Sequence, residues 1–447
     1  MALFPQDALN PGVRKREVFG WAMYDFANSG YTTVVLTAVF NSYFVGVVAR
    51  DAAWATLAWT LTLALSSLIV MVAMPAIGAF ADLRAAKKRV LVLATLGCVG
   101  ATLLLATVGR GDLAVAVLLI VLSNTFYSIG ESMTASFLPE LAKPDAMGRV
   151  SGWGWSFGYL GGMLSLGLSL AYVLSAQARG ESATSFVPVT MLITAAVYGL
   201  AALVTFALLR ERAVPQPQAA DSVGSLGFAA SWQRLKSTLQ ASKNYADFRW
   251  LLACGTCYQA GISVVIALAA IYAEQTLGFK QADTMALIFI VNIAAALGAF
   301  GFGYWQDRIG HKVALGVTLA GWVVMTLLAA LAQTASVFWV AAVLAGLCMG
   351  SSQSAGRAMV GLFAPQKQLG EFFGLWTFAT RLAAIIGPIT YGLVTVVTQG
   401  NHRIAIVSTA VFFLLGLFLL APVNVARGTA AGRANLSRPN EPLDGLA

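Results

Sequence analysis

The chain has 447 residues, of which 58% are hydrophobic and only 11% are charged, and its mean hydropathy is +0.77. This composition excludes a water-soluble domain and a disordered chain, and runs long enough to cross the ~30 Å hydrocarbon core recur along it. The net charge of +9 does not indicate nucleic-acid binding, because most of the 28 lysines and arginines fall in segments predicted to lie on one side of a membrane.

Each apolar run is predicted to be a helix, because backbone groups in lipid must bond one another and the alternation typical of a β-barrel is absent. Twelve runs predict an all-α membrane protein with two pseudo-symmetric six-helix halves. The positive charges place both termini in the cytoplasm of a multi-pass protein, with the bacterial inner membrane as its expected location. The predicted segments are a cytoplasmic N-terminal segment (1–18), the first half (19–209), a cytoplasmic linker with an amphipathic helix (210–247), the second half (248–421) and a polar, disordered cytoplasmic tail (422–447).

The first run carries Asp25 and Asn28, which share one helix face because they are three positions apart. An ionisable group inside a membrane helix is costly unless it faces a partner or water. Two interpretations of Asp25 stay open. It is a gating or proton-handling residue that lines a cavity, or it is a structural acid, at the membrane edge or in an ion pair.

A charged turn follows the second run and recurs after the eighth. The first copy holds Gly78, Asp82 and Arg84. The second copy holds Gly303, Asp307, Arg308, Gly310 and Lys312. We call these two segments, 78–84 and 303–312, the gating turns. A tight charged turn that recurs half a chain apart indicates a duplicated architecture.

The fourth run carries a polar stripe at helical spacing, formed by Asn124, Tyr127, Ser128 and Glu131. Such a stripe is expected to face the bundle interior or an aqueous cavity. In the fifth run Gly154, Gly158 and Gly162 recur every four residues, which predicts close helix packing.

The second half places Gln259, Arg357 and Arg381 inside its runs, with Gln259 aligned to Asn28 of the first half. Aligning the prolines after the fourth and tenth runs sets Glu131 opposite Arg357. We therefore expect these two residues to pair across the central cavity, and the alternative is that each pairs within its own half. Arg381 lies about 15 Å into its run by helical rise, which indicates an anionic or carboxylate-bearing solute or a buried acid partner.

Enzymatic chemistry is not expected, and no cofactor or metal is predicted. The four cysteines all lie in apolar runs, where small packing residues are the simplest interpretation. The two histidines, His311 and His402, lie at loops with no nucleophile or metal cluster around them. The sequence contains no phosphate-binding loop of the Walker type, so ATP is not the expected energy source.

These features resemble the major facilitator superfamily, and the second gating turn matches its Gly-x-x-x-Asp-Arg-x-Gly-x-Lys loop. In the first gating turn Leu83 stands where arginine is usual, and the following glycine is missing. The resemblance implies twelve helices in two halves and a gating role for both turns.

A narrower resemblance covers nearly the whole chain, most specifically in the run from Tyr24 to Ser29. This run and several later motifs are similar to the autophagy-related vacuolar effluxer family and its bacterial relatives. The resemblance implies a transporter and makes amino acids the first solute class to consider. The later motifs are Phe137-Leu138-Pro139-Glu140, Arg149-Val150-Ser151-Gly152, Gly158-Tyr159-Leu160-Gly161-Gly162, Glu371-Phe372-Phe373-Gly374 and Gly387-Pro388.

We therefore predict a secondary active transporter that moves a small polar solute by alternating access, with Asp25 or Glu131 as the group that carries a coupling proton. The expected partners are the solute, protons and membrane lipids, and the expected state is a monomer. An exporter of amphipathic drugs, or a receptor or scaffold that transports nothing, stays open as an alternative. The expected solute-binding or coupling residues are Asp25, Asn28, Asn124, Tyr127, Glu131, Gln259, Arg357 and Arg381.

Overall fold

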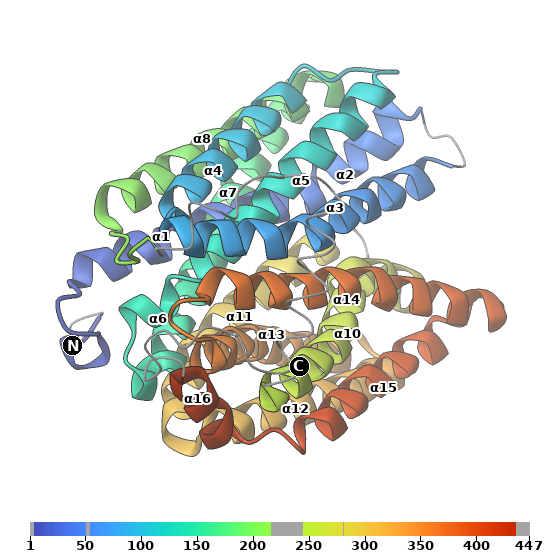
Figure 1. The fold of residues 1–447 in the computed structure, drawn as a ribbon. Coiled ribbons are helices and arrows are strands. Elements are labelled where there is room, and N and C mark those ends of the chain that lie inside the picture. Colours follow the sequence, from blue (N-terminus) through green and yellow to red (C-terminus); the bar gives the residue numbers. More distant parts are fainter. Residues whose placement is uncertain (1–3, 51–53, 216–244, 280, 435–447) are drawn as a thin grey trace, which may run out of the picture.

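The computed structural model describes residues 4–50, 54–215, 245–279 and 281–434. In these ranges the protein is almost entirely helical, and twelve helices are long and apolar enough to cross a membrane. The predicted all-α membrane fold is confirmed. Figure 1 shows the helices in two groups, one coloured blue to green and the other yellow to red.

The first half begins with α1 (Lys15–Tyr31), whose span continues to Val48 through two π-helical stretches, 32–38 and 44–48. A short helix, α2 (Phe40–Tyr43), separates these stretches. The remaining long helices of this half are α3 (Ala55–Arg84), α4 (Lys87–Leu105), α5 (Leu113–Ala135), α7 (Met147–Ala178) and α8 (Ala183–Leu208), with the short α6 (Leu138–Leu141) between α5 and α7.

The second half repeats this order from residue 246 onward. Proline occurs inside α3 and α8 and again in this half. Membrane helices tolerate proline where surrounding groups can satisfy the freed backbone carbonyl. The long helices of the second half are α10 (Ala246–Leu277), α11 (Gln281–Ile309), α12 (His311–Leu331), α13 (Ala335–Phe363), α14 (Leu369–Val397) and α15 (His402–Leu420).

The two halves meet where α7 crosses α11 and where α3 crosses α14, and glycines make both crossings close. A Cβ atom on Gly152 would overlap the backbone of Ala299, and one on Gly78 would overlap the backbone of Gly370. At these crossings the N-terminal part of α7 meets the C-terminal part of α11, and the N-terminal part of α14 meets the C-terminal part of α3. We call this end of the molecule the closed end, and Figure 1 shows the N-terminal segment, α6 and α16 (Val425–Ala434) there.

The polar tail was expected to be disordered, and for residues 425–434 this expectation was wrong. Asn424 accepts a hydrogen bond from the Arg427 N–H at 3.0 Å and so caps the start of α16. Gly428 and Gly432 then allow α16 to lie directly on Phe363, which is fully buried. The amphipathic helix expected in the linker falls within 216–244, which lies outside the described residues.

Candidate functional site

The first ion pair between the halves joins Asp25 on α1 to Arg357 on α13. Arg357 Nη1 donates to Asp25 Oδ2 at 2.7 Å, and the two side chains are only 6% and 11% exposed for Arg357 and Asp25, respectively. Gly154 on α7 lies against the pair, and a Cβ atom there would overlap both charged groups. The absence of a side chain at Gly154 therefore leaves room for this contact.

The first half offers Arg357 further contacts besides the Asp25 carboxylate. Its Nε donates to Ser151 Oγ at 3.1 Å and its Nη2 donates to the Ser151 carbonyl at 2.7 Å. The guanidinium also lies 4.8 Å from the ring centroid of Trp21 and 5.2 Å from that of Trp155. One arginine of the second half is thus inserted into a polar and aromatic pocket of the first half.

The second ion pair joins Glu131 on α5 to Arg381 on α14, again between the halves. Arg381 Nη2 donates to Glu131 Oε2 at 2.7 Å. This pair is more accessible, because the Arg381 side chain is 17% exposed and the Glu131 side chain 36%. Arg381 also lies 5.8 Å from the ring centroid of Tyr127. The acid belongs to the first half and the arginine to the second half in both pairs.

The expected pairing of Glu131 with Arg357 was wrong, and so was the alternative that each pairs within its own half. The alignment behind it was sound. Tyr24 lies over Gly130, and Tyr258 lies over Gly356 in the same way, so the next residues along the two helices hold equivalent positions. Equivalent positions lie on opposite sides of the pseudo-twofold axis, and here each side chain reaches a different partner.

The same equivalence corrects the alignment of the first helix of each half. Tyr24 corresponds to Tyr258, so Gln259 corresponds to Asp25 and not to Asn28. Gln259 Nε2 donates to Gln353 Oε1 at 2.7 Å, within the second half. A neutral amide pair therefore lies where the first half carries an acid.

The other predicted polar residues lie in the interior of the first half. Tyr198 donates to Asn28 Oδ1 at 2.7 Å, and Asn124 donates to Ser66 Oγ at 2.9 Å. Tyr127 stacks on Tyr31, with ring centroids 5.3 Å apart. Three buried atoms of the predicted site residues have no hydrogen-bond partner among the described residues: Asn28 Nδ2, Asn124 Oδ1 and Arg381 Nε.

Both gating turns reach across to the other half through their aspartates. Asp82 accepts hydrogen bonds from the N–H groups of Gly370 and Glu371, at 2.9 and 3.0 Å, at the start of α14. Asp307 accepts from the N–H groups of Gly148 and Arg149, at 2.8 and 3.1 Å, at the start of α7. Each carboxylate thus satisfies free donors at the positive end of a helix in the opposite half.

The first gating turn makes this contact despite its departures from the sequence pattern. Gly310 in the second gating turn has a φ of 93°. The corresponding residue, Ala85, directly follows the first gating turn and has a φ of 48°. Lys312 donates to the Ala421 carbonyl at 2.6 Å, and Arg84 lies over the Phe80 ring at 5.4 Å, each within its own half. Gly303 contacts the backbone of Gly148, and Arg308 is exposed.

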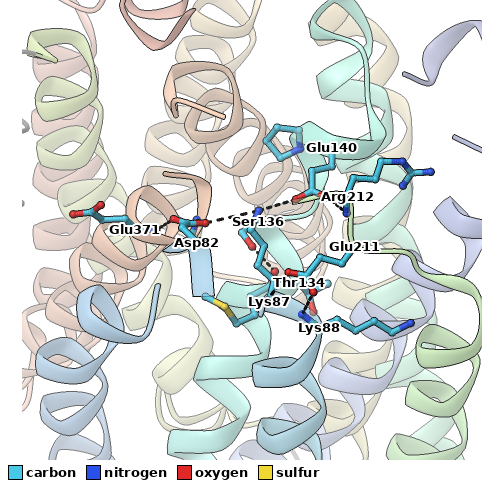
Figure 2. Close-up of polar contacts among 12 residues, drawn as sticks. Asp82, Lys87, Lys88, Thr134, Ser136, Glu140, Glu211, Arg212 and Glu371 are labelled. Atoms are coloured by element: carbon cyan, nitrogen blue, oxygen red, sulfur yellow. Dashed lines mark hydrogen bonds and ion pairs between the residues drawn. The ribbon is translucent and has the colours of Figure 1, made fainter. Parts of the chain in front are cut away.

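Sequence reasoning missed a group of charges beside the first gating turn (Figure 2). Lys87 is 1% exposed, and its Nζ donates to Glu140 Oε1 at 2.7 Å and lies 3.9 Å from Asp82 Oδ1. Glu211 and Arg212, which follow α8, reach the same group. In the sequence, Lys87 is one of the basic residues that follow the first gating turn, and Glu140 belongs to a family motif. No spacing in the sequence brings these residues together.

Comparisons of the sequence with known proteins agree with this geometry. A family model described as "Vacuole effluxer Atg22 like" matches residues 43–433. The chain is 26% identical over 406 residues to an uncharacterized MFS-type transporter, YxiO, of Bacillus subtilis, covering 90% of this chain and 93% of the relative. It is also 26% identical to Autophagy-related protein 22-1 of Aspergillus fumigatus, covering 63% of this chain and 48% of that longer relative.

Solved structures show the same fold. The human organic anion transporter MFSD10 superposes with a TM-score of 0.73 at 15% identity, covering 91% of this chain and 99% of the other. The fucose:proton symporter FucP of E. coli superposes with a TM-score of 0.69 at 15% identity, covering 92% and 98%. At this identity the likeness establishes the architecture alone.

Proposed function

This chain belongs to the Atg22-like vacuole effluxer family and has the fold of the major facilitator superfamily of secondary transporters, and from that premise we propose that it moves a small zwitterionic solute, amino acids first. It is accordingly a transporter rather than an enzyme. The observation that carries the solute proposal is the Glu131–Arg381 pair, which joins the two halves and is the more exposed of the two ion pairs.

A zwitterion suits this pair because its two charges match the two side chains. A solute carboxylate can take the place of Glu131 on the guanidinium of Arg381, and a solute ammonium can bind Glu131 in return. Arg381 Nε, Asn28 Nδ2 and Asn124 Oδ1 are buried without a partner among the described residues, so they are available to a solute.

Alternating access follows from the contacts of the closed end. The caps made by Asp82 and Asp307, together with the Asp25–Arg357 pair, join the halves. We place this end in the cytoplasm, because exposed cations such as Arg84, Arg89 and Arg308 lie there. The conformation is then closed toward the cytoplasm, and opening inward requires all three contacts to separate.

Proton coupling is assigned to Asp25. Arg357 and a proton compete for the same carboxylate, because the buried guanidinium leaves no place for a proton on the oxygen that it contacts. When the closed end opens and Arg357 withdraws, Asp25 is left in the interior without its counter-charge and takes up a proton instead. The protein works as a monomer in this scheme.

Counterflow tests the proposal. Purified protein in liposomes preloaded with unlabelled amino acids should accumulate the labelled form, more strongly with a pH gradient, and the Arg381→Ala variant should not. If no amino acid exchanges but a lipophilic cation does, the protein is a drug exporter and the solute assignment is wrong. If neither moves, a receptor or scaffold role replaces transport.

A further inference from the structure

A connected set of polar contacts links the residues that follow α8 to the cap that Asp82 makes on α14. It begins at Glu211, which is half-buried. Its carboxylate accepts hydrogen bonds from the N–H groups of Lys87 and Lys88, at 2.7 and 3.1 Å. These two donors lie in the first turn of α4, so Glu211 caps that helix from a distant part of the chain.

Fixing the backbone of Lys87 also fixes its side chain. The ammonium group is buried between Glu140 Oε1, at 2.7 Å, and Asp82 Oδ1, at 3.9 Å. It is the counter-charge for both carboxylates, and Figure 2 shows it lying between them. Asp82 in turn binds the first turn of α14, in the other half. Glu211 therefore acts on the closed end through Lys87 and Asp82.

The residues around Glu211 are anchored to the same half at further points. Lys88 Nζ donates to the Leu209 carbonyl at 2.7 Å. The Arg212 N–H donates to Glu140 Oε2 at 3.3 Å, and Arg212 Nη2 donates to Glu17 Oε2 at 2.7 Å. These are the first residues of the segment that joins the two halves.

The second half repeats the anchoring without the cap. Lys312 donates to the Ala421 carbonyl at 2.6 Å, as Lys88 does to that of Leu209. Arg427 binds Asp247 at the start of α10 at 2.7 Å, as Arg212 binds Glu17 at the start of α1. Within the described part of the chain, however, no carboxylate caps the start of α12. The cap by Glu211 is thus specific to the half from which the connecting segment leaves.

We propose that Glu211 is a positioning residue of the transport cycle, which makes the cap of α14 by Asp82 depend on the segment that joins the two halves. Withdrawing Glu211 frees the first turn of α4, moves Lys87 away from Asp82 and Glu140, and weakens the contact between the halves. Its part in a transport cycle rests on the proposed function, whereas its effect on the closed end does not.

The test measures how often the closed end opens. Met74 is fully buried where α3 crosses α14 at Gly374. In a full-length protein whose four native cysteines are replaced by alanine, a Met74→Cys substitution supplies a thiol that a water-soluble maleimide reaches only when the halves separate. Adding Glu211→Ala removes both hydrogen bonds to the first turn of α4 and should raise the labelling rate at least about tenfold, the population change that one lost hydrogen bond to a charged group produces by itself. Glu211→Gln, which keeps one acceptor oxygen, should give an intermediate rate.

The matched control is Asp247→Asn, which removes the corresponding anchor in the second half and leaves the first gating turn intact. This variant removes a charged partner of Arg427, but it should not change the labelling rate of the Met74→Cys thiol. Equal rates with and without Glu211→Ala, or an equal rise with Asp247→Asn, would overturn the proposal. Labelling needs no solute, so it remains decisive even if the protein transports no amino acid.

Discussion

Arg357 on α13 lies 2.7 Å from Asp25 on α1, and 332 positions of sequence separate these two partners. Each hydrogen bond of the guanidinium to a described residue goes to the half of the protein to which Arg357 does not belong. The closed end can therefore open only when a charged side chain leaves a buried site that satisfies it. Any signal that weakens this one contact favours opening.

Removing the arginine should destabilise the protein severely. Arg357→Ala leaves the Asp25 carboxylate buried without a counter-charge, which costs about 3–5 kcal/mol. The midpoint of thermal unfolding of the purified variant should fall accordingly. Adding Asp25→Asn to Arg357→Ala should recover much of the loss, and no recovery would mean that the arginine stabilises the protein through Trp21 and Trp155 rather than through the carboxylate.

Removing the acid should uncouple transport from the pH gradient. Asp25→Asn cannot exchange a proton, so pH-driven accumulation in proteoliposomes should disappear while solute exchange continues. Glu131→Gln, measured in parallel, separates the two acids. Unaltered pH-driven uptake by Asp25→Asn would exclude Asp25 as the proton carrier.

Replacing the more exposed arginine should weaken solute binding. Arg381→Lys keeps the charge but loses the planar fork that binds a carboxylate with two bonds. The KM for counterflow should rise about tenfold to a hundredfold, which corresponds to a lost hydrogen bond of roughly 1.5–3 kcal/mol. Arg403→Lys is the control, because within the described ranges the hydrogen bonds of the Arg403 guanidinium go to the carbonyls of Ala330 and Ala332. The KM of this variant should stay near that of the parent protein.

Relieving backbone strain directly after the first gating turn should stabilise the protein. Ala85 has a φ of 48°, a left-handed conformation that costs a residue with a Cβ atom about 1 kcal/mol. Ala85→Gly should therefore raise the unfolding midpoint, whereas Gly310→Ala, with a φ of 93° at the corresponding place, should lower it. A lower midpoint for Ala85→Gly would show that glycine's freedom in the unfolded chain outweighs the strain.

Acidification should stabilise the folded protein through Glu211. Burial raises the pKa of this carboxyl above its ordinary value, with Glu140 adding to the rise and the N–H groups of Lys87 and Lys88 opposing it. As the pH falls through that raised pKa, the folded protein takes up the proton before the unfolded chain does. The contribution of Glu211 to the free energy of unfolding then rises.

The midpoint of thermal unfolding should accordingly rise as the pH falls through this raised pKa. Glu140, Glu17, Lys87 and Arg212 surround Glu211 and also carry charge, so the control is Glu211→Gln. This variant should show a flatter pH profile. An identical profile in both proteins would place the titrating group elsewhere.

The sequence predicted the helices and the gating turns because both depend on local patterns. Long apolar runs define the spans, and a glycine followed by an aspartate marks each turn. Even the departure at Ala85 does not alter the contact that Asp82 makes, because the contact needs the carboxylate and not the usual glycine. The gating role of these turns stays a prediction.

The partners of the charged residues could not be predicted in the same way. Internal alignment identified Glu131 and Arg357 as equivalent positions, as the contacts of Tyr24 and Tyr258 confirm, although it misaligned Gln259 with Asn28. It does not say how far each position lies from the pseudo-twofold axis, and that distance decides whether Glu131 meets Arg357 or Arg381. The group around Lys87 brings together side chains from four separate parts of the chain, and only the three-dimensional packing shows it.

The separation of charge between the halves bears on how the protein is made. Helices enter the bilayer from the first to the last, so Asp25 and Glu131 are inserted long before the arginines that neutralise them have left the ribosome. The newly made first half is therefore an incomplete intermediate with two unmatched acids in its interior. Synthesis that stops after α8 should leave a fragment that quality-control proteases remove, unless the missing helices are supplied as a second polypeptide.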